Sequence, residues 1–289
     1  MTPLYTEADR EAGARALAII EQVVDPLHDQ IRHVPWVEDS ELARLSNAVP
    51  AGPLTLSGTL MASMDMARCA LDHIRQVMAN SDYHPTAVLH PLVRVALVGA
   101  ARMVTALQPP EPDVRTANAL GVVWRDSDGQ RQAFNKLKTF RQLSLAPDAQ
   151  LLTDADSQYK ELKRLGADIS EGALIQRMIA AVAVALDSAM AGNPGLPREH
   201  AELASEWANW LWSIYSGSSH ALSWPRLIPE FYGDGIIVTG NFCGDLLEVA
   251  TVTQLGLYAV VDRIQPGTAG TNAEVDYSIA ISLINPSAG

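Results

Sequence analysis

The sequence predicts an all-α protein, a multi-helix bundle of about eight helices with a loop-rich C-terminal tail. Apolar residues recur with the period of an α-helix along most of the chain, and β-branched runs with strict alternation are scarce. About one residue in seven is alanine, the strongest helix former. Two of the helical segments are apolar on nearly every side, which is typical of helices at the centre of a bundle.

Four segments of the first half show this helical period, and proline-rich stretches separate them. They are residues 7–30, 57–80, 85–107 and 112–143. The first begins with Thr6-Glu7-Ala8-Asp9, which resembles a capping box, and Pro109 and Pro110 end the third. The sequence Asp126-Ser127-Asp128-Gly129 predicts a break within the fourth helix.

Four further helices are expected in the second half, at residues 148–165, 168–190, 199–222 and 245–263. Gly166 has the position of a C′ glycine after the first of these, and Asp168 to Glu171 form a cap for the next. The proline- and glycine-rich stretch 224–244 predicts an ordered loop with a short strand at 236–238.

No linker is long or polar enough to divide the chain, so residues 1–264 are expected to form a single all-α domain. Residues 265–289 then form the tail, in which 275–284 alternates weakly enough to admit a short edge strand. No internal repeat is visible.

The composition indicates an acidic globular protein with an ordinary core. Hydrophobic residues make up 48% and charged residues 19% of the 289 residues, which excludes wholesale disorder. The net charge of −12 argues against a general binder of polyanions. Cys69 and Cys243 are too few and too far apart for a disulfide framework or a thiolate zinc site.

We expect a cytoplasmic protein without membrane spans. No apolar core of a secretory signal follows Met1. The two most apolar stretches, 88–107 and 173–190, each contain two charged residues, so we interpret both as buried core helices. Neither a metal nor a cofactor is expected, because no spacing typical of metal ligands and no phosphate-binding glycine loop occurs.

The apolar helix 85–107 carries Arg94, whose guanidinium needs a carboxylate partner if it is buried. The preceding helix offers Asp65 and Asp72, which share one face with Arg68 and Arg75. Two interpretations are open. One is a preorganised polar pocket between these helices, and the other is an intrahelical ladder of charges on a solvated face with arginines that extend to water.

The helix 199–222 carries the second candidate group, Ser216 and His220, which lie four residues apart on one face. Trp212 and Trp224 can wall a cavity beside them. The pair is either a binding or catalytic histidine with a hydroxyl neighbour, or a core histidine that the serine satisfies. A second stripe of this helix is expected in the core: Leu203, Trp207, Trp210, Leu211 and Ile214.

The stretch 215–224 resembles the Y-x-x-x-S-x-x-x-H-G-x-x-W helix of a group of uncharacterised all-helical actinobacterial proteins that are similar in style to HEPN bundles. Asp72-His73 resembles the D-H-L helix of that group, and Arg94 with Ala100-Ala101 resembles its R-x-x-x-E-x-x-A-A helix. Val98 stands where the group has an acid, and Ala221 where it has a glycine.

The residues themselves favour a binding module, whereas the resemblance implies a ribonuclease. The candidate pocket consists of Ser216, His220, Arg94, Asp65, Asp72, His73, Trp212 and Trp224. We expect an interaction or regulatory module that holds a protein partner or a small ligand there. The alternative is a HEPN-like, metal-independent ribonuclease of the defence or toxin kind, with His220 or His73 as the acid–base residue. Only this alternative implies RNA as a partner.

Overall fold

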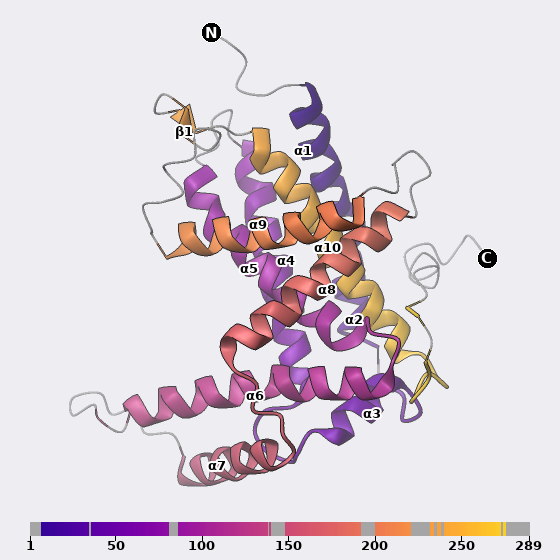
Figure 1. Cartoon of the computed structure of the whole chain (residues 1–289), viewed down its shortest axis with the longest axis vertical. Helices are drawn as coiled ribbons and strands as arrows, with labels where there is room; N and C mark the ends of the chain where they lie inside the picture. The colour runs from indigo at the N-terminus through magenta and orange to yellow at the C-terminus, as the bar shows by residue number, and fades with distance from the viewer. Residues whose placement is uncertain are drawn as a thin grey trace.

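A computed structural model of the chain describes residues 7–34, 36–80, 86–137, 139, 148–191, 200–220, 232–233, 236–237, 240–272 and 274–275. These residues form an all-α bundle, as the sequence predicts (Figure 1).

The predicted first helix is one helical run with a change of winding inside it. Helix α1 (Glu7–Ile19) passes through a π-helical turn (Ile20–Val24) into α2 (Asp25–Ile31). Pro26 lies in the first turn of α2 and cannot donate a backbone hydrogen bond to the preceding turn, which is consistent with the wider winding before it.

Helix α3 (Glu41–Ala48) is a finding that the apolar periodicity does not predict, because eight residues give barely two turns. It begins at a good cap, where the Ser40 hydroxyl accepts a hydrogen bond from the backbone N–H of Ala43.

The next three helices are α4 (Leu56–Asn80), α5 (Thr86–Leu107) and α6 (Pro112–Leu137). The predicted break at residues 126–129 is wrong, since α6 continues through them. Its acidic side chains there accept hydrogen bonds instead of turning the chain: Asp126 accepts from Thr59 and Arg102, and Asp128 accepts from Gln132.

Helices α7 (Ala149–Arg164) and α8 (Glu171–Ala191) lie close to their predicted positions. Gly166 has a φ of +73°, the left-handed conformation expected of a C′ glycine. After α9 (His200–Ser219), Tyr232–Gly233 (β1) pairs antiparallel with Ile236–Ile237 (β2), so the predicted short strand exists. Helix α10 (Gly240–Ile264) completes the bundle.

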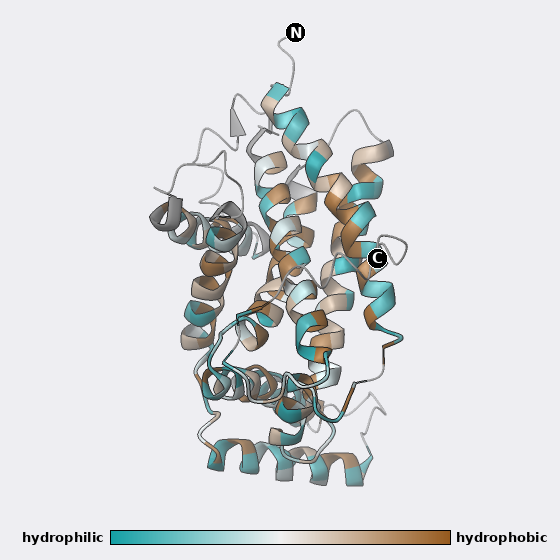
Figure 2. Cartoon of the chain, turned by 90° about the vertical axis from the view of Figure 1, so that its right-hand side faces the viewer, coloured by the Kyte–Doolittle hydropathy of each residue, from teal (hydrophilic) through white to brown (hydrophobic). Residues whose placement is uncertain are grey.

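Helix α5 is the axis of the bundle and packs against α4, α6, α8, α9 and α10 (Figures 1 and 2). The approach of α4 is close because Gly99 lies directly against the backbone of Ser63. Gly256 similarly allows α10 to lie against Met103 of α5. The apolar residues predict α4, α5, α8 and α9 as the centre, but α10 contacts α5 far more extensively than α8 or α9 does.

Two expectations of complete burial are wrong. Helix α8 is apolar but has an exposed face, on which Val184 is 57% exposed and Ala180 is also exposed. The expected core stripe of α9 is divided: Leu211 and Ile214 are buried, whereas three members are accessible to solvent. These are Leu203, Trp207 and Trp210.

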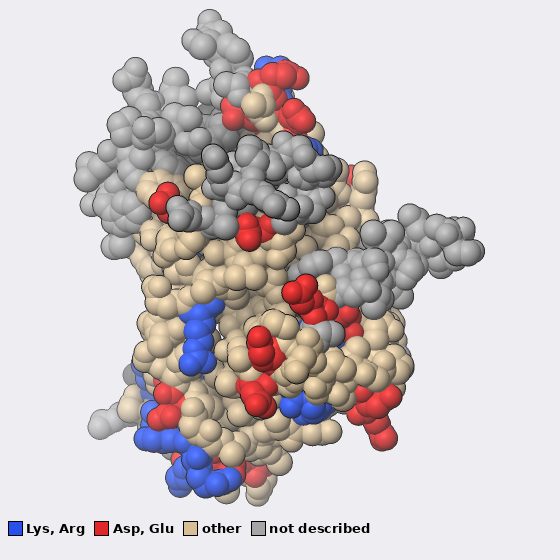
Figure 3. Space-filling model, turned by 45° about the vertical axis from the view of Figure 1, so that its right-hand side comes forward, with Lys and Arg blue, Asp and Glu red and all other residues tan. Residues whose placement is uncertain are grey.

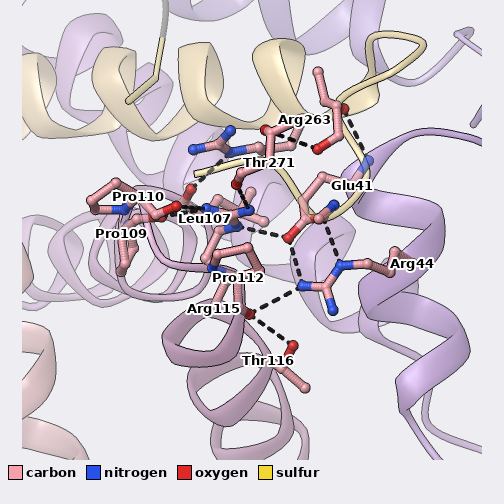
Figure 4. A network of polar contacts seen from close by, with 12 residues as sticks. Glu41, Arg44, Leu107, Pro109, Pro110, Pro112, Arg115, Thr116, Arg263 and Thr271 are labelled. Atoms are coloured by element: carbon pink, nitrogen blue, oxygen red, sulfur yellow. Dashed lines mark hydrogen bonds and ion pairs between the residues drawn. The ribbon is translucent and has the colours of Figure 1, made fainter. Parts of the chain in front are cut away.

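A buried ion pair fixes the opposite end of the bundle from β1 and β2. Glu41 of α3 and Arg115 of α6 are both fully buried, and their carboxylate and guanidinium are 2.7 Å apart. Arg115 also donates to the carbonyls of Pro109, Pro110 and Thr271 (Figure 4). The contacts tie the start of the predicted tail to α3 and α6. The predicted edge strand at 275–284 lies outside the described residues except at its first position, Val275, which is buried.

Two helices, over residues 89–107 of α5 and 242–264 of α10, are long and apolar enough to cross a membrane. In the bundle 67% and 72% of the most apolar stretch of each helix is buried, and core helices of soluble proteins have the same length and apolar character. On the face shown in Figure 3, large uncharged areas separate the charged side chains, and basic side chains gather at the end formed by α6 and α7.

Candidate functional site

The structure does not bring all of the predicted pocket residues together. Asp65 lies 2.7 Å from Nε2 of the buried His28 and 3.7 Å from Arg32. Asp72 accepts hydrogen bonds from Arg75 and Gln76 on its own helix. The expectation that one of these carboxylates binds Arg94 is therefore wrong, because each is already paired on its own side of α4.

His73 is exposed, and its Nδ1–H donates to the backbone carbonyl of Cys69 one turn earlier, at 2.9 Å. His220 is exposed immediately after the end of α9, and Ser216 is half-buried. The two residues are joined through their backbones, by a hydrogen bond from the N–H of His220 to the carbonyl of Ser216 at 3.1 Å. Trp224, which the sequence places in the same pocket, lies outside the described residues.

Two predicted residues from different helices do meet. The guanidinium carbon of Arg94 lies 3.7 Å from the centre of the Trp212 ring, which is a cation–π contact between α5 and α9. Trp212 is only 6% exposed. Burial lowers the pKa of Arg94 to about 10, because the bundle interior disfavours its charge.

Next to this contact, α9 and α10 form a hydrogen bond in the interior. The hydroxyl of Tyr215 donates to Oδ2 of Asp245 at 2.6 Å, and neither side chain is exposed. Burial raises the pKa of Tyr215 well above its ordinary value, and the neighbouring carboxylate of Asp245 acts in the same direction. The phenol is therefore a permanent donor over the physiological range.

His90, one turn before Arg94 on α5, also belongs to this group. Its ring meets the edge of the Tyr215 ring at 5.1 Å between centroids and stacks on Phe242 of α10 at 6.3 Å. Burial lowers the pKa of His90 to about 4, so the imidazole is neutral at pH 7.

Two carboxyl groups of α10, those of Asp245 and Glu248, have pKa values raised far above the ordinary range. Burial raises the pKa of Asp245 to about 7, against the opposing hydrogen bond from Tyr215. Burial also raises the pKa of Glu248 to about 8, and the charge of Asp245 three residues earlier adds to that rise. At neutral pH the pair therefore gains or loses protons readily.

We call this group the buried polar cluster; its members are His90, Arg94, Trp212, Tyr215, Asp245 and Glu248. Three enclosed atoms of the cluster have no hydrogen-bond partner among the described residues: Nη1 of Arg94, Oδ1 of Asp245 and Oε2 of Glu248. Buried polar atoms are nearly always satisfied in folded proteins, and each exception needs a reason.

The ion pair shown in Figure 4 differs in this respect. Glu41 accepts hydrogen bonds from Arg44, Arg115 and the backbone N–H of Gly270, and Arg115 donates through all three of its guanidinium nitrogens. Such a saturated network stabilises a fold and offers a ligand no free donor or acceptor. The buried polar cluster, in contrast, keeps hydrogen-bonding atoms that no described residue satisfies.

Sequence reasoning found Arg94 and Trp212 but missed Asp245, Glu248 and His90. A signal for the acids exists: they share one face of α10 and are its only charged residues between 240 and 261, and Phe242 extends the same face by one turn. No group of three or more metal-ligating side chains occurs in the part of the chain that the structure describes.

Comparison of this chain with protein-family models, with curated proteins and with solved structures gave no match.

Proposed function

We propose that this chain is a cytoplasmic regulatory or interaction module that binds a small polar ligand at the buried polar cluster. The observation that carries the proposal is a set of three enclosed atoms, on Arg94, Asp245 and Glu248, for which the described part of the chain offers no hydrogen-bond partner. An unpaired buried polar group costs about 1–3 kcal/mol, and more when it is charged, so a structural role alone gives no reason to keep all three.

The chemistry of the three atoms defines what such a ligand offers. Arg94 needs a hydrogen-bond acceptor and favours an anionic one, held against the face of Trp212. Asp245 and Glu248 accept from an amine or hydroxyl donor when ionised. A small molecule with a donor at one end and an acidic acceptor at the other, such as an amino acid or a hydroxy acid, satisfies both requirements.

A thermal-shift screen of the full chain against amino acids, hydroxy acids and small amines tests this proposal, and calorimetry follows for each compound that raises the melting temperature. Binding should be lost in Arg94→Met and in Glu248→Gln. The matched controls are Arg164→Met and Glu161→Gln, which remove the same side chains from an exposed pair on α7. Equal binding by the cluster variants and the controls would refute the proposal.

Among the described residues, no contact favours the ribonuclease alternative, which stays a prediction. His73 and His220 are both exposed, and among the described residues neither contacts a second acid–base side chain. Incubation of the protein with total RNA in EDTA tests it directly. Cleavage that disappears in His220→Gln or His73→Gln would favour the alternative over a binding module.

A further inference from the structure

A second feature lies away from the buried polar cluster, in an apolar groove between α6 and α8. The groove has a volume of about 690 Å³, and the turn between α5 and α6 closes one end of it. Its walls are lined largely by small or aliphatic side chains: Pro110, Val114, Ala117, Ala180, Ala181 and Val184. Val114 and Val184 are 44% and 57% exposed, so the described residues leave a hydrophobic surface open to solvent.

The side chains that line the groove follow helical spacing on both walls. Residues 110, 114 and 117 precede or belong to the first turns of α6, and 177, 180, 181 and 184 form one face of α8. Two rows of this kind with small residues between them accept the apolar face of a third helix.

The same chain exposes a helix face that fits this description. Leu203, Trp207 and Trp210 follow the spacing i, i+4, i+7 along α9, and we call them the α9 ridge. Leu203 is 47% exposed and both tryptophans are partly exposed. A shallow hollow of about 230 Å³ lies among them and Glu206. Tryptophan is the residue most enriched at the energetic centres of protein interfaces.

Size and charge are complementary between the two surfaces. The ridge presents bulky side chains, and the groove presents alanines that leave room for them. Glu206 lies beside the ridge, and Arg177 lies in the groove wall, where it donates a 3.4 Å hydrogen bond to the neutral Asn118. Among the described residues neither Arg177 nor Glu206 has an ion-pair partner. Asp113, the acid in the groove, already faces Arg44 of its own chain.

We propose that a second copy of this chain occupies the groove, with the α9 ridge of one protomer against α6 and α8 of its partner and Glu206 of one protomer beside Arg177 of the other. A two-fold arrangement forms this contact twice and covers both hydrophobic surfaces of each protomer. The proposal is independent of the ligand at the buried polar cluster, because none of the cluster residues lines the groove or the ridge.

Sedimentation velocity and light scattering of the full chain, from micromolar to several hundred micromolar, test the proposal. We expect a species of twice 31.1 kDa that dissociates on dilution. Val184→Glu should weaken association roughly tenfold or more, as expected for a charge in an apolar contact. Ala173→Glu, an equally exposed change on α8 outside the groove, is the control and should leave the dimer unchanged.

A charge exchange then distinguishes this contact from any other self-association. Arg177→Glu and Glu206→Arg should each weaken the dimer, and the double variant should restore it, while circular dichroism and the melting temperature of the monomer stay unchanged. A monomer at every concentration would overturn the proposal. So would a dimer that Val184→Glu leaves intact, or a double variant that is no better than the single ones.

Discussion

At the scale of single residues, the buried polar cluster contains one strong hydrogen bond, and three of its other polar atoms have no partner among the described residues. Tyr215 fixes Oδ2 of Asp245, whereas Oδ1 of the same carboxyl group has no partner among the described residues. The phenol therefore positions the carboxyl group without saturating it, which is what a binding site requires of a supporting residue.

Tyr215→Phe should consequently destabilise the protein by about 1–2 kcal/mol, because it removes the donor and leaves a fully buried carboxyl group without its hydrogen bond. Urea unfolding followed by circular dichroism measures the loss. The control is Tyr258→Phe, whose hydroxyl accepts from the half-buried Gln254 instead of donating to a buried carboxyl group, so its loss should cost less. An equal cost for the two variants would contradict the role assigned to Tyr215.

At the scale of helices, the sequence predicts the long elements well because each carries an apolar stripe over many turns. It does not predict α3, which has two turns, or the unbroken course of α6, since Asp126 and Asp128 bind side chains on neighbouring turns and helices that no local pattern reveals. Burial around a helix is equally a tertiary property: α8 and α10 are both apolar, yet α8 keeps an exposed face and α10 lies along α5.

The close approach of α4 and α5 gives a prediction with an internal control. A Cβ atom on Gly99 would collide with the backbone carbonyl oxygen of Ser63, so Gly99→Ala should force the two helices apart and cost about 1–3 kcal/mol. Gly129 also lies inside a helix but has no heavy atom within 4 Å of its own added Cβ. Gly129→Ala should instead stabilise α6 by about 0.5–1 kcal/mol.

Differential scanning calorimetry of both variants measures these opposite signs. A stabilised Gly99→Ala would mean that α4 and α5 are not packed at this distance.

At the scale of the whole molecule, the bundle places a saturated ion pair at one end and an unsaturated polar cluster among α5, α9 and α10. Two of the six members of that cluster could be anticipated: Arg94 and Trp212 stand out in the sequence as a charge in an apolar helix and an aromatic residue in a tryptophan-rich one. Their pairing, and the choice of Asp245 and Glu248 over Asp65 and Asp72, depend on how distant helices pack, which a single sequence does not specify.

The carboxyl pair also makes stability depend on pH in an unusual direction. The folded pKa values of Asp245 and Glu248, about 7 and about 8, lie above those of the unfolded chain, so the folded state binds protons more tightly. Their contribution to stability is therefore present at low pH and lost as pH rises through 7 and 8. Below about pH 6.5 the buried neutral His90 acts in the opposite direction, because it protonates in the unfolded chain first.

The free energy of unfolding of Glu248→Gln, measured by urea titration at pH 6.5 and pH 9, tests most directly whether the cluster is kept for binding or for folding. The wild-type chain should gain about 1–3 kcal/mol between pH 9 and pH 6.5, and the variant should lose most of that gain. At pH 9 the variant should be at least as stable as the wild type, because it removes a buried charge that the fold does not use. A variant less stable by about 1 kcal/mol or more at pH 9 would show that the carboxylate supports the fold, and would contradict the assignment of the cluster as a binding site.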